Sequence, residues 1–360
     1  EIELVKKELQ FFIDKKVPQV KFVDRTFNCR HDHAMAIWTY IHEHDNGITN
    51  FHFEVSADLL NEKEIALINR MRPGLIQLEI GVQSANEITI REINRTMKID
   101  VLSTIVDKIK KGNNVHQHLD LIAGLPYEGY ESFGKSFDRV YKMNPEQLQL
   151  GFLKVLKGSV MHDRAQEYGI VYQDRAPYEV LSTKWLTYAE VIRLKQIEEM
   201  VEVYYNSGQF CCTMAALEQE FASPFCMYEC LAAYYDEKNA FAVSHSRIGR
   251  YEILYDFIVK TCKERSEQYM EMLTLDMYLR DNVKKRPEFL RESGVSSDEA
   301  AAFYKKEEKE RTYLKAYEGY DRRQMRKMTH LERIDGKTVL FDYKNRDPLT
   351  GNAAIYYLSE

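Results

Sequence analysis

The chain has 360 residues, of which 44% are hydrophobic and 29% are charged, and its formal net charge is −6 at pH 7. This is the composition of an ordinary globular protein that is long enough for two domains. The negative charge argues against a nucleic-acid-binding surface, and no apolar run approaches the roughly 20 residues that cross a bilayer. We therefore expect neither a membrane nor a nucleic acid among its partners.

The start of the chain and its cysteines indicate its extent and its compartment. The first residue is Glu1 rather than Met, a helical pattern begins at once, and the given residues show no signal-peptide pattern. We expect an excised fragment whose natural N-terminus lies upstream. The six cysteines follow no disulfide framework, so we expect a cytoplasmic protein in a reducing environment.

Short β-type runs alternate with longer helical patterns over about the first 160 residues. The apolar runs cover residues 20–23, 51–55, 75–82, 119–122 and 148–153. Each gap between them is about long enough for one strand–helix–strand crossover, which needs roughly 30 residues. Repeated units of this kind build a parallel sheet, either open or closed into a barrel.

The pattern changes after about residue 170. Residues 178–206 show the spacing of one long helix, and further helical segments continue, with breaks, to residue 328. Near the end of the chain, Asp335-Gly336 is a strong hairpin signal between two β-type runs. The predicted domains are therefore an α/β domain, a helical domain, and a C-terminal β-hairpin or small sheet packed on the helical domain, at residues 1–170, 171–328 and 329–360.

Polar residues lie at or near the ends of four successive apolar runs. They are Asp24 and Thr26, Glu54 and Ser56, Gln83, and Asp120. Chemistry in parallel barrels gathers at the carboxyl ends of the strands, and an unpaired charge buried there is costly. One such residue can be a capping or ion-paired side chain, but four in succession predict a pocket for a polar ligand. This argument gives a pocket and not a reaction.

Four motifs, taken in order, carry a family resemblance. They are residues 22–28 (FVDRTFN), Gly81-Val82-Gln83-Ser84 with Ile93-Asn94-Arg95, residues 119–126 (LDLIAGLP) and Gly158-Ser159. By these motifs and their spacing, roughly residues 1–170 resemble the radical S-adenosylmethionine superfamily, in the branch of the oxygen-independent coproporphyrinogen oxidases and the methylthiotransferases. The resemblance implies an α/β fold: a partial TIM-like (β/α) barrel, then a mostly helical domain with a small C-terminal β-sheet.

The resemblance implies that S-adenosylmethionine binds at the ends of the early strands. The amino group of its methionine would meet Asp24 and Thr26, where many relatives have Gly-Gly-Glu. Glu54 with Ser56 would face the ribose or the methionine end.

Later strands would complete this cofactor site. Gln83 and Arg95 would contact the methionine carboxylate and the ribose region, and the planar fork of Arg95 suits a carboxylate. Asp120 would accept hydrogen bonds from the ribose hydroxyls. The backbone after Gly124 would approach the adenine.

The sequence lacks the Cys-x-x-x-Cys-x-x-Cys motif that defines the superfamily. That motif belongs in a loop that would precede Glu1, and without three thiolates no [4Fe–4S] cluster is anchored. Cys226 and Cys230 offer a pair but no third cysteine, and we interpret them as helix residues one turn apart. We therefore expect no metal ligands in this chain and an inactive fragment.

By the same resemblance, the longer protein would be an enzyme. A [4Fe–4S] cluster, reduced by a donor such as flavodoxin or ferredoxin, would cleave S-adenosylmethionine, and the 5′-deoxyadenosyl radical would attack an unknown substrate. Residues 339–353 (VLFDYKNRDPLTGNA) resemble an uncharacterised domain found after such barrels, in proteins that commonly carry a cobalamin-binding domain upstream. The link to cobalamin rests on domain arrangement alone and is an analogy.

Two groups of histidines have alternative interpretations. Cys29, His31 and His33 could bind zinc, contact a substrate, or lie in a loop that enters a helix, and we favour the loop. His116 and His118 share one face of their strand with Asp120, so His118 could lie near the pocket or be a packed strand residue, and we favour the packed residue.

Two rival functions stay open. One is a non-catalytic nucleotide-binding barrel module that acts through its helical C-terminal domain. The other is an ordinary barrel enzyme that uses Glu54, Glu79 and Asp120 for acid–base chemistry. Turnover without iron would support the second rival.

Overall fold

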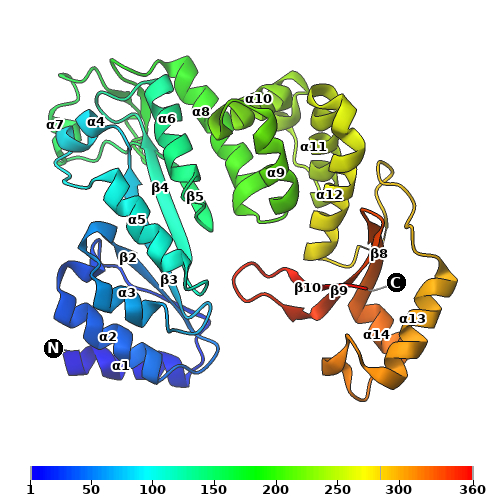
Figure 1. Ribbon diagram of the computed structural model, residues 1–360. Helices are drawn as coiled ribbons and strands as arrows, with labels where there is room; N and C mark the ends of the chain where they lie inside the picture. Colours follow the sequence, from blue (N-terminus) through cyan, green and yellow to red (C-terminus); the bar gives the residue numbers. More distant parts are fainter. Residues whose placement is uncertain (1, 284, 359–360) are drawn as a thin grey trace. The chain divides into compact units, whose positions relative to one another are not determined.

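The computed structural model describes residues 2–283 and 285–358, and the contacts divide the chain into two compact units (Figure 1). The first unit comprises Glu1–Asn206 and Ser223–Ala232, and the second comprises Ser207–Ala222 and Ala233–Glu360. The two units meet at residues 206/207, 222/223 and 232/233, whereas the predicted domain boundaries lie near residues 170 and 328. The predicted domains stay a prediction.

A parallel five-stranded sheet, curled into half a barrel, forms the centre of the first unit (Figure 1). Its strands pair in chain order, with the bounds β1 Gln19–Lys21, β2 Asn50–Val55, β3 Ile76–Gln83, β4 His116–Ala123 and β5 Gln147–Phe152. Each of the five predicted apolar runs overlaps one of these strands. The prediction of a parallel α/β sheet is confirmed.

Helices connect the strands and pack on the apolar face of the sheet. They are α1 Ile2–Asp14, α2 His31–Glu43, α3 Glu62–Ile68, α4 Glu87–Glu92, α5 Ile99–Lys110 and α6 Tyr130–Tyr141, with short 3-10 turns η1 Phe27–Cys29 and η2 Ala57–Leu59. On β3 the side chains alternate strictly, because Ile76, Leu78, Ile80 and Val82 are buried and the residues between them are half-buried. This period of two gives the sheet an apolar face for the helices and a polar face inside the half barrel.

The remainder of the first unit follows β5. It contains α7 Val160–Asp163, β6 Val171–Tyr172, β7 Val180–Ser182, α8 Tyr188–Val201, the π-helical turn η3 Glu202–Asn206 and the first part of α10 Pro224–Glu237. The predicted helix over 178–206 is wrong in its first part, where β7 pairs with β6. A capping box fixes the start of α8, because the Thr187 side chain accepts from the backbone of Glu190 and the Glu190 carboxylate accepts from the backbone of Thr187.

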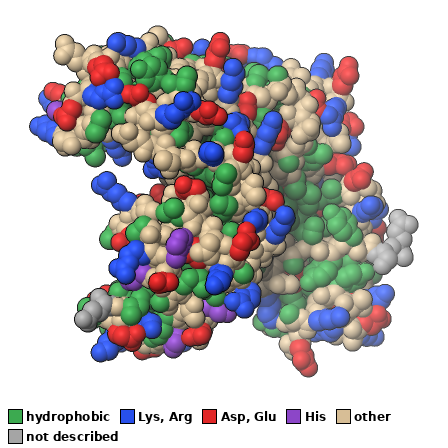
Figure 2. Space-filling view, turned by 60° about the vertical axis from the view of Figure 1, so that its left-hand side comes forward, with side chains coloured by type: hydrophobic (Ala, Val, Ile, Leu, Met, Phe, Trp, Pro, Cys, Tyr) green, Lys and Arg blue, Asp and Glu red, His purple; other side chains and the backbone are tan. Residues whose placement is uncertain are grey.

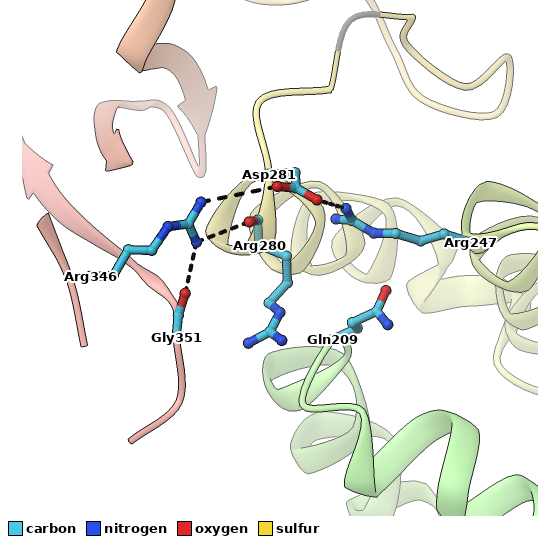
Figure 3. A pocket seen from close by; sticks show the side chains of 6 residues that line it. All are labelled: Gln209, Arg247, Arg280, Asp281, Arg346 and Gly351. Atoms are coloured by element: carbon cyan, nitrogen blue, oxygen red, sulfur yellow. Dashed lines mark hydrogen bonds and ion pairs between the residues drawn. The ribbon is translucent and has the colours of Figure 1, made fainter. Parts of the chain in front are cut away.

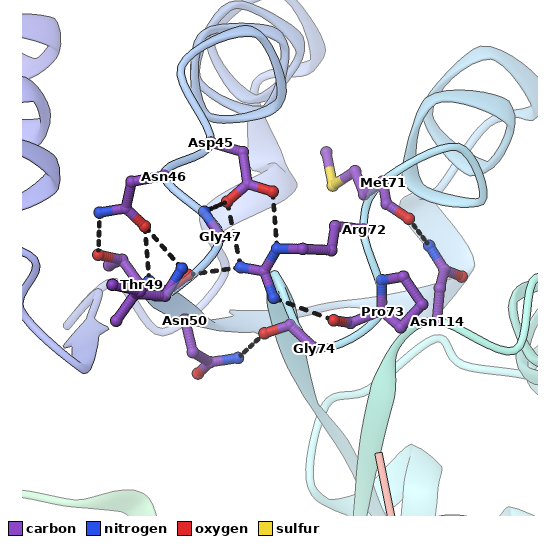
Figure 4. A network of polar contacts seen from close by, with 11 residues as sticks. Asp45, Asn46, Gly47, Thr49, Asn50, Met71, Arg72, Pro73, Gly74 and Asn114 are labelled. Carbon is purple, nitrogen blue, oxygen red and sulfur yellow. Dashed lines mark hydrogen bonds and ion pairs between the residues drawn. The ribbon is translucent and has the colours of Figure 1, made fainter. Parts of the chain in front are cut away.

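A polar network joins the loops before β2 and β3, at the amino ends of these strands (Figure 4). Arg72 donates from Nε to Asp45 Oδ2 at 2.7 Å and from Nη2 to Asp45 Oδ1 at 3.1 Å. Arg72 Nη2 also donates to the carbonyl oxygen of Thr49 at 3.2 Å, and the Asn50 side chain donates to the carbonyl of Gly74 at 2.9 Å. The network lies at the end of the sheet where barrel proteins place residues for stability rather than for chemistry.

The second unit combines helices with a small antiparallel sheet. Its elements are α9 Cys211–Leu217, η4 Glu218–Glu220, η5 Ala240–Ala242, α11 Arg247–Thr261, η6 Lys263–Arg265, α12 Ser266–Arg280, α13 Ser297–Glu310, η7 Lys315–Tyr317, α14 Arg322–Met328, β8 Thr329–Ile334, β9 Lys337–Arg346 and β10 Ala353–Tyr357. The sheet order is β10-β9-β8. Asp335 and Gly336 join β8 to β9 with positive φ angles of 50° and 70°, as a two-residue hairpin turn requires. The predicted hairpin is confirmed.

Two buried groups organise this unit. One is an apolar cluster in which Tyr304 of α13, Met325 of α14 and Leu340 of β9 pack together. The other is Asp276 of α12, whose carboxylate accepts from the backbone N–H of Cys212 at 2.9 Å and of Thr213 at 2.8 Å. Asp276 thus satisfies amide groups at the start of α9 that the helix itself leaves unpaired.

The surface carries charges of both signs. On the face drawn in Figure 2, Lys and Arg side chains are interspersed with Asp and Glu rather than gathered into one field. None of the helices within residues 2–283 and 285–358 combines the length and the apolar character that a bilayer crossing requires.

Candidate functional site

A cavity of about 500 Å³ lies at the carboxyl ends of β2, β3 and β4 in the first unit. Six of the eight predicted cofactor-binding residues line it, namely Thr26, Glu54, Ser56, Gln83, Arg95 and Asp120. Its volume falls within the range of roughly 300–1,000 Å³ that small-molecule sites occupy. The polar face of the half barrel thus ends in a pocket, as the strand-end residues predict.

Asp120 of β4 joins two strands at this cavity. Its Oδ1 accepts a hydrogen bond of 2.8 Å from the backbone N–H of Val82, and its Oδ2 accepts one of 3.0 Å from Nε2 of Gln83. Burial raises the pKa of Asp120 to about 6, although the Val82 N–H and the charge of Arg95 act in the opposite direction. The carboxyl can therefore change its protonation state near neutral pH.

The end of β3 is shaped by an irregularity in its pairing. Gly81 pairs with Asp120, but the register with β4 shifts between Gly81 and Gln83, and Gln83 has a φ of 69°. A Cβ atom at Gly81 would lie 2.9 Å from Nε2 of Gln83 and 3.4 Å from Nη1 of Arg95. Arg95 also donates from Nη1 to the carbonyl oxygen of Gly81 at 3.0 Å. A glycine here leaves room for the side chains of Gln83 and Arg95 to converge on the strand end.

Four charged or titratable side chains gather next to Glu54 on the polar face of the sheet. Lys21 Nζ lies 3.1 Å from Glu79 Oε2 and 3.6 Å from Glu54 Oε1. His52 Nε2 lies 3.0 Å from Glu79 Oε2, without the alignment of a hydrogen bond. Burial would raise the pKa of Glu79, but the hydrogen bond from Lys21 and the nearby His118 and His52 lower it.

The protonation states in this group follow from burial and from Lys21. Burial lowers the pKa of His52, and the charge of Lys21 lowers it further. Burial also lowers the pKa of His118, which the structure buries as predicted for a packed strand residue. Sequence reasoning missed Lys21 and His52 as site neighbours. No local sequence pattern indicates them, because the pairing of Lys21 with His52 is set by the register of β1 and β2, which places both beside Glu54.

Ser56 is held by a residue that sequence reasoning also missed. The buried Asn28 of η1 donates to the carbonyl of Ser56 at 2.8 Å and accepts from its N–H at 2.9 Å. The Ser56 hydroxyl donates to Asp58 at 2.7 Å. Asn28 thereby ties the turn after β1 to the end of β2.

Two predicted residues lie apart from the others. Asp24 lines a separate cavity of about 210 Å³, which shares Thr26 with the larger one and also contains Cys29 and His33. Gly124 has a φ of 90°, and a Cβ atom there would lie 2.7 Å from Cγ1 of Val180. The structure therefore places Gly124 against β7 and not among the residues that line the larger cavity.

The predicted metal alternatives do not form in the described residues. His31 Nδ1 lies 3.0 Å from the buried Glu64, and the ligand atoms of Cys29, His31 and His33 do not come together around one point. Cys226 and Cys230 lie on α10 as free thiols. Within residues 2–283 and 285–358, no three cysteines gather as a [4Fe–4S] cluster requires.

Comparison with known proteins shows a family for this chain and relatives for a part of it. A family model described as "Protein of unknown function (DUF4080)" matches residues 166–348. The oxygen-independent coproporphyrinogen III oxidase of Salmonella typhimurium is 29% identical over 107 residues, which are 28% of this chain and 23% of the relative. An oxygen-independent coproporphyrinogen-III oxidase-like protein, HemZ of Bacillus subtilis, is 28% identical over 119 residues, or 31% of this chain and 22% of the relative. The chain thus spans less than a quarter of the length of these relatives.

Solved structures are similar at lower identity. The radical S-adenosylmethionine methyltransferase TsrM from Kitasatospora setae, with cobalamin and a [4Fe-4S] cluster bound, aligns at a TM-score of 0.42 and 13% identity, over 48% of this chain and 33% of that chain. Coproporphyrinogen III oxidase (HemN) from Escherichia coli aligns at a TM-score of 0.33 and 18% identity, over 41% and 37% of the two chains.

Proposed function

Because the chain belongs to the DUF4080 family and to the radical S-adenosylmethionine superfamily, we propose that its first unit binds S-adenosylmethionine in the cavity at the ends of β2, β3 and β4. The observation that supports this most is the convergence of Gln83, Arg95 and Asp120 on one strand end. These three side chains come from separate segments and offer an amide, a cation and an anion to one ligand.

The donors and acceptors of the cavity suit the two polar parts of this cofactor. Nη1 of Arg95 donates a hydrogen bond to the carbonyl of Gly81. Because a guanidinium has five N–H donors, the remaining N–H groups of Arg95 are available for the methionine carboxylate. Each oxygen of Asp120 accepts one hydrogen bond within the protein and has a second acceptor site. We propose that these free acceptor sites bind the ribose hydroxyls.

The acidic side chains at the other end of the cavity would face the positive charges of the cofactor. Glu54 lines the cavity, and its partner Lys21 is shared with Glu79. Two carboxylates with one lysine leave one negative charge, which favours a sulfonium or an ammonium group. We propose that Glu54 and Ser56 bind near the methionine end.

The [4Fe–4S] cluster of the superfamily does not fit the described residues of this chain, because they offer no group of three thiolates at the cavity. The described residues can therefore bind and position S-adenosylmethionine, and the radical reaction needs cluster ligands from elsewhere. We propose that a protein that also carries the cluster ligands cleaves S-adenosylmethionine reductively and acts on an unknown substrate. Its electron donor would be a protein such as flavodoxin or ferredoxin, and it would also carry a cobalamin domain. A nucleotide-binding module without catalysis is the second candidate function, and sequence upstream of Glu1 with or without the three cysteines would distinguish the two.

Binding of S-adenosylmethionine to the 360-residue chain tests the proposal directly. Isothermal titration calorimetry is expected to show one site, with affinity reduced at least about tenfold by Asp120→Ala and by Arg95→Ala, since each removes charged hydrogen bonds. Asp107→Ala and Arg91→Ala are matched controls, because both side chains form ion pairs on exposed helix surfaces. Binding that is equal in all five proteins, or absent from the unaltered chain, would overturn the proposal.

A further inference from the structure

The second unit contains a cavity of about 290 Å³ whose lining is dominated by arginine (Figure 3). It is lined by Gln209, Arg247, Arg280, Asp281, Arg346 and Gly351. Among the described residues, Asp281 is the one acidic side chain in this lining, so the charged groups sum to +2. The arginines come from the start of α11, the end of α12 and the end of β9, and the fold brings these three cations together.

Two of the arginines share the single carboxylate. Arg247 forms an ion pair with Asp281 from Nη1 and donates from Nη2 to the carbonyl of Met277 at 3.1 Å. Arg346 Nη2 lies 4.0 Å from the other oxygen of Asp281. Arg346 Nη1 donates to the carbonyls of Arg280 and Gly351, at 3.1 Å and 2.7 Å. One negative charge therefore serves two guanidinium groups.

Arg280 has no carboxylate partner among the described residues. Its Nη1 donates to the carbonyl of Thr350 and, at 3.2 Å, to Oδ1 of Asn352. Figure 3 shows its guanidinium in the space between Gln209 and Gly351. A Cβ atom on Gly351 would lie 3.6 Å from Nη1 of Arg280, at ordinary van der Waals contact, so the backbone of Gly351 borders this group. The negative end of the α12 dipole favours one positive charge at its C-terminal end, such as that of Arg280. It does not explain why three arginines gather there.

Two buried polar atoms in the lining have no hydrogen-bond partner within residues 2–283 and 285–358. They are Nε of Arg247 and Oε1 of Gln209. A buried donor without a hydrogen bond is destabilising, and a ligand oxygen beside Arg247 would supply the missing acceptor. The Gln209 side chain offers a hydrogen-bonding group for a hydroxyl on the same ligand.

We infer that Arg247, Arg280 and Arg346 form a binding site for a phosphate-type oxyanion, either free phosphate or the phosphoryl group of a small ester. Guanidinium groups bind tetrahedral and planar oxyanions through paired N–H donors, and the net charge of +2 matches the dianionic form of phosphate. This site lies wholly within the second unit and does not depend on the proposed binding of S-adenosylmethionine.

Titration of the full 360-residue chain with inorganic phosphate tests the inference, with adenosine monophosphate as the ester probe. Arg280→Gln is expected to weaken binding by at least about tenfold, and Arg346→Gln is expected to act in the same direction. Arg323→Gln is the control, because Arg323 is exposed on α14. Arg346 is exposed as well, so the Arg346→Gln variant tests the site even if Arg280→Gln lowers the stability of the unit.

The two probes distinguish the source of the oxyanion. Tighter binding of the ester than of free phosphate assigns the site to a phosphorylated small molecule, and the reverse order assigns it to the inorganic ion. Loss of affinity in Arg280→Gln with either probe supports the inference. No saturable binding of either probe, or equal weakening in the Arg323→Gln control, overturns it.

Discussion

Oδ1 of Asp120 accepts a hydrogen bond of 2.8 Å from the backbone N–H of Val82, and this contact makes a side chain of β4 part of the end of β3. The contact occurs where the pairing of the two strands changes register. Removal of the acceptor therefore affects the shape of the cavity as well as its charge.

Replacement of Asp120 by Asn separates these two effects. The carboxyl has a pKa of about 6 in the folded chain, above its ordinary value of 3.8. Its contribution to the free energy of unfolding is therefore fully present below about pH 4 and is lost as the pH rises through 6. Asp120→Asn keeps an acceptor for Val82 and cannot ionise. We expect it to unfold at an equal or higher temperature than the unaltered chain at pH 7.5, and to lose this advantage between pH 6 and 4.

Thermal unfolding of both proteins between pH 4 and 8 measures this difference. Asp107→Asn serves as the control for a surface aspartate, with no pH-dependent advantage expected. An advantage of Asp120→Asn that grew as the pH fell would contradict the proposed burial of this carboxyl.

Gly81→Ala is expected to damage the cavity and leave the fold intact. The new Cβ would lie 2.9 Å from Nε2 of Gln83, which can move because it is the far end of a flexible side chain. The amide would then leave Asp120, and we expect binding of S-adenosylmethionine to weaken several-fold with little change in stability. Gly151→Ala on β5 is the matched control, since its nearest neighbour would be at 3.4 Å. Calorimetric titration of the two variants makes the comparison, and equal binding would show that the Gln83 amide has no role.

Arg72→Ala is expected to lower stability without affecting the cavity at the other end of the strands. Arg72 makes two hydrogen bonds to Asp45 and others to backbone carbonyls, so its loss is expected to cost about 1–3 kcal/mol. Burial would raise the pKa of Asp45, but the hydrogen bonds from Arg72 and from the N–H of Gly47 hold it below 3.8. The contribution of the Asp45–Arg72 pair to the free energy of unfolding is therefore present at neutral pH and is lost as the pH falls through the lowered pKa of Asp45.

Urea unfolding at pH 7 of Arg72→Ala and of Arg70→Ala checks this prediction. Arg70 is exposed two residues earlier, and its removal is expected to change little. Weakened binding of S-adenosylmethionine in Arg72→Ala, at a temperature where the chain is folded, would show that the two ends of the sheet are coupled.

The chain by itself is expected to release no 5′-deoxyadenosine. After anaerobic treatment with iron and sulfide and then reduction, it should bind S-adenosylmethionine without cleaving it, because no three thiolates gather in its described part. Chromatographic detection of the nucleoside is the measurement. Release that disappeared in a Cys226→Ser, Cys230→Ser double variant would show instead that α10 carries a cluster.

The sequence contained enough to predict the sheet, because each strand is a short apolar run with polar residues at its end. The resemblance to the radical S-adenosylmethionine superfamily is confirmed by the coproporphyrinogen oxidase relatives. The helix predicted over 178–206 was partly wrong, because Val180 lies in β7 and pairs with Tyr172 of β6. Apolar residues at helical spacing do not exclude such a short strand. The capping box at Thr187 and Glu190 was the signal for the true start.

The site was harder to predict in its details. Lys21 and Asn28 act through contacts with residues 28 to 58 positions away, which no local pattern reveals. The arginine cavity was missed because Arg247, Arg280 and Arg346 are widely separated in the sequence. Only the fold of the second unit brings them together.

The chain passes from the first unit to the second and back before it enters the second unit again, and this order limits how the protein can be truncated. Residues 223–232 belong to the first unit although sixteen residues of the second unit, 207–222, precede them. A chain that stopped at Asn206 would lose the start of α10, and a chain that began at Ser207 would carry it without its neighbours. The two units therefore alternate along the sequence, and no single cut in the chain separates one from the other.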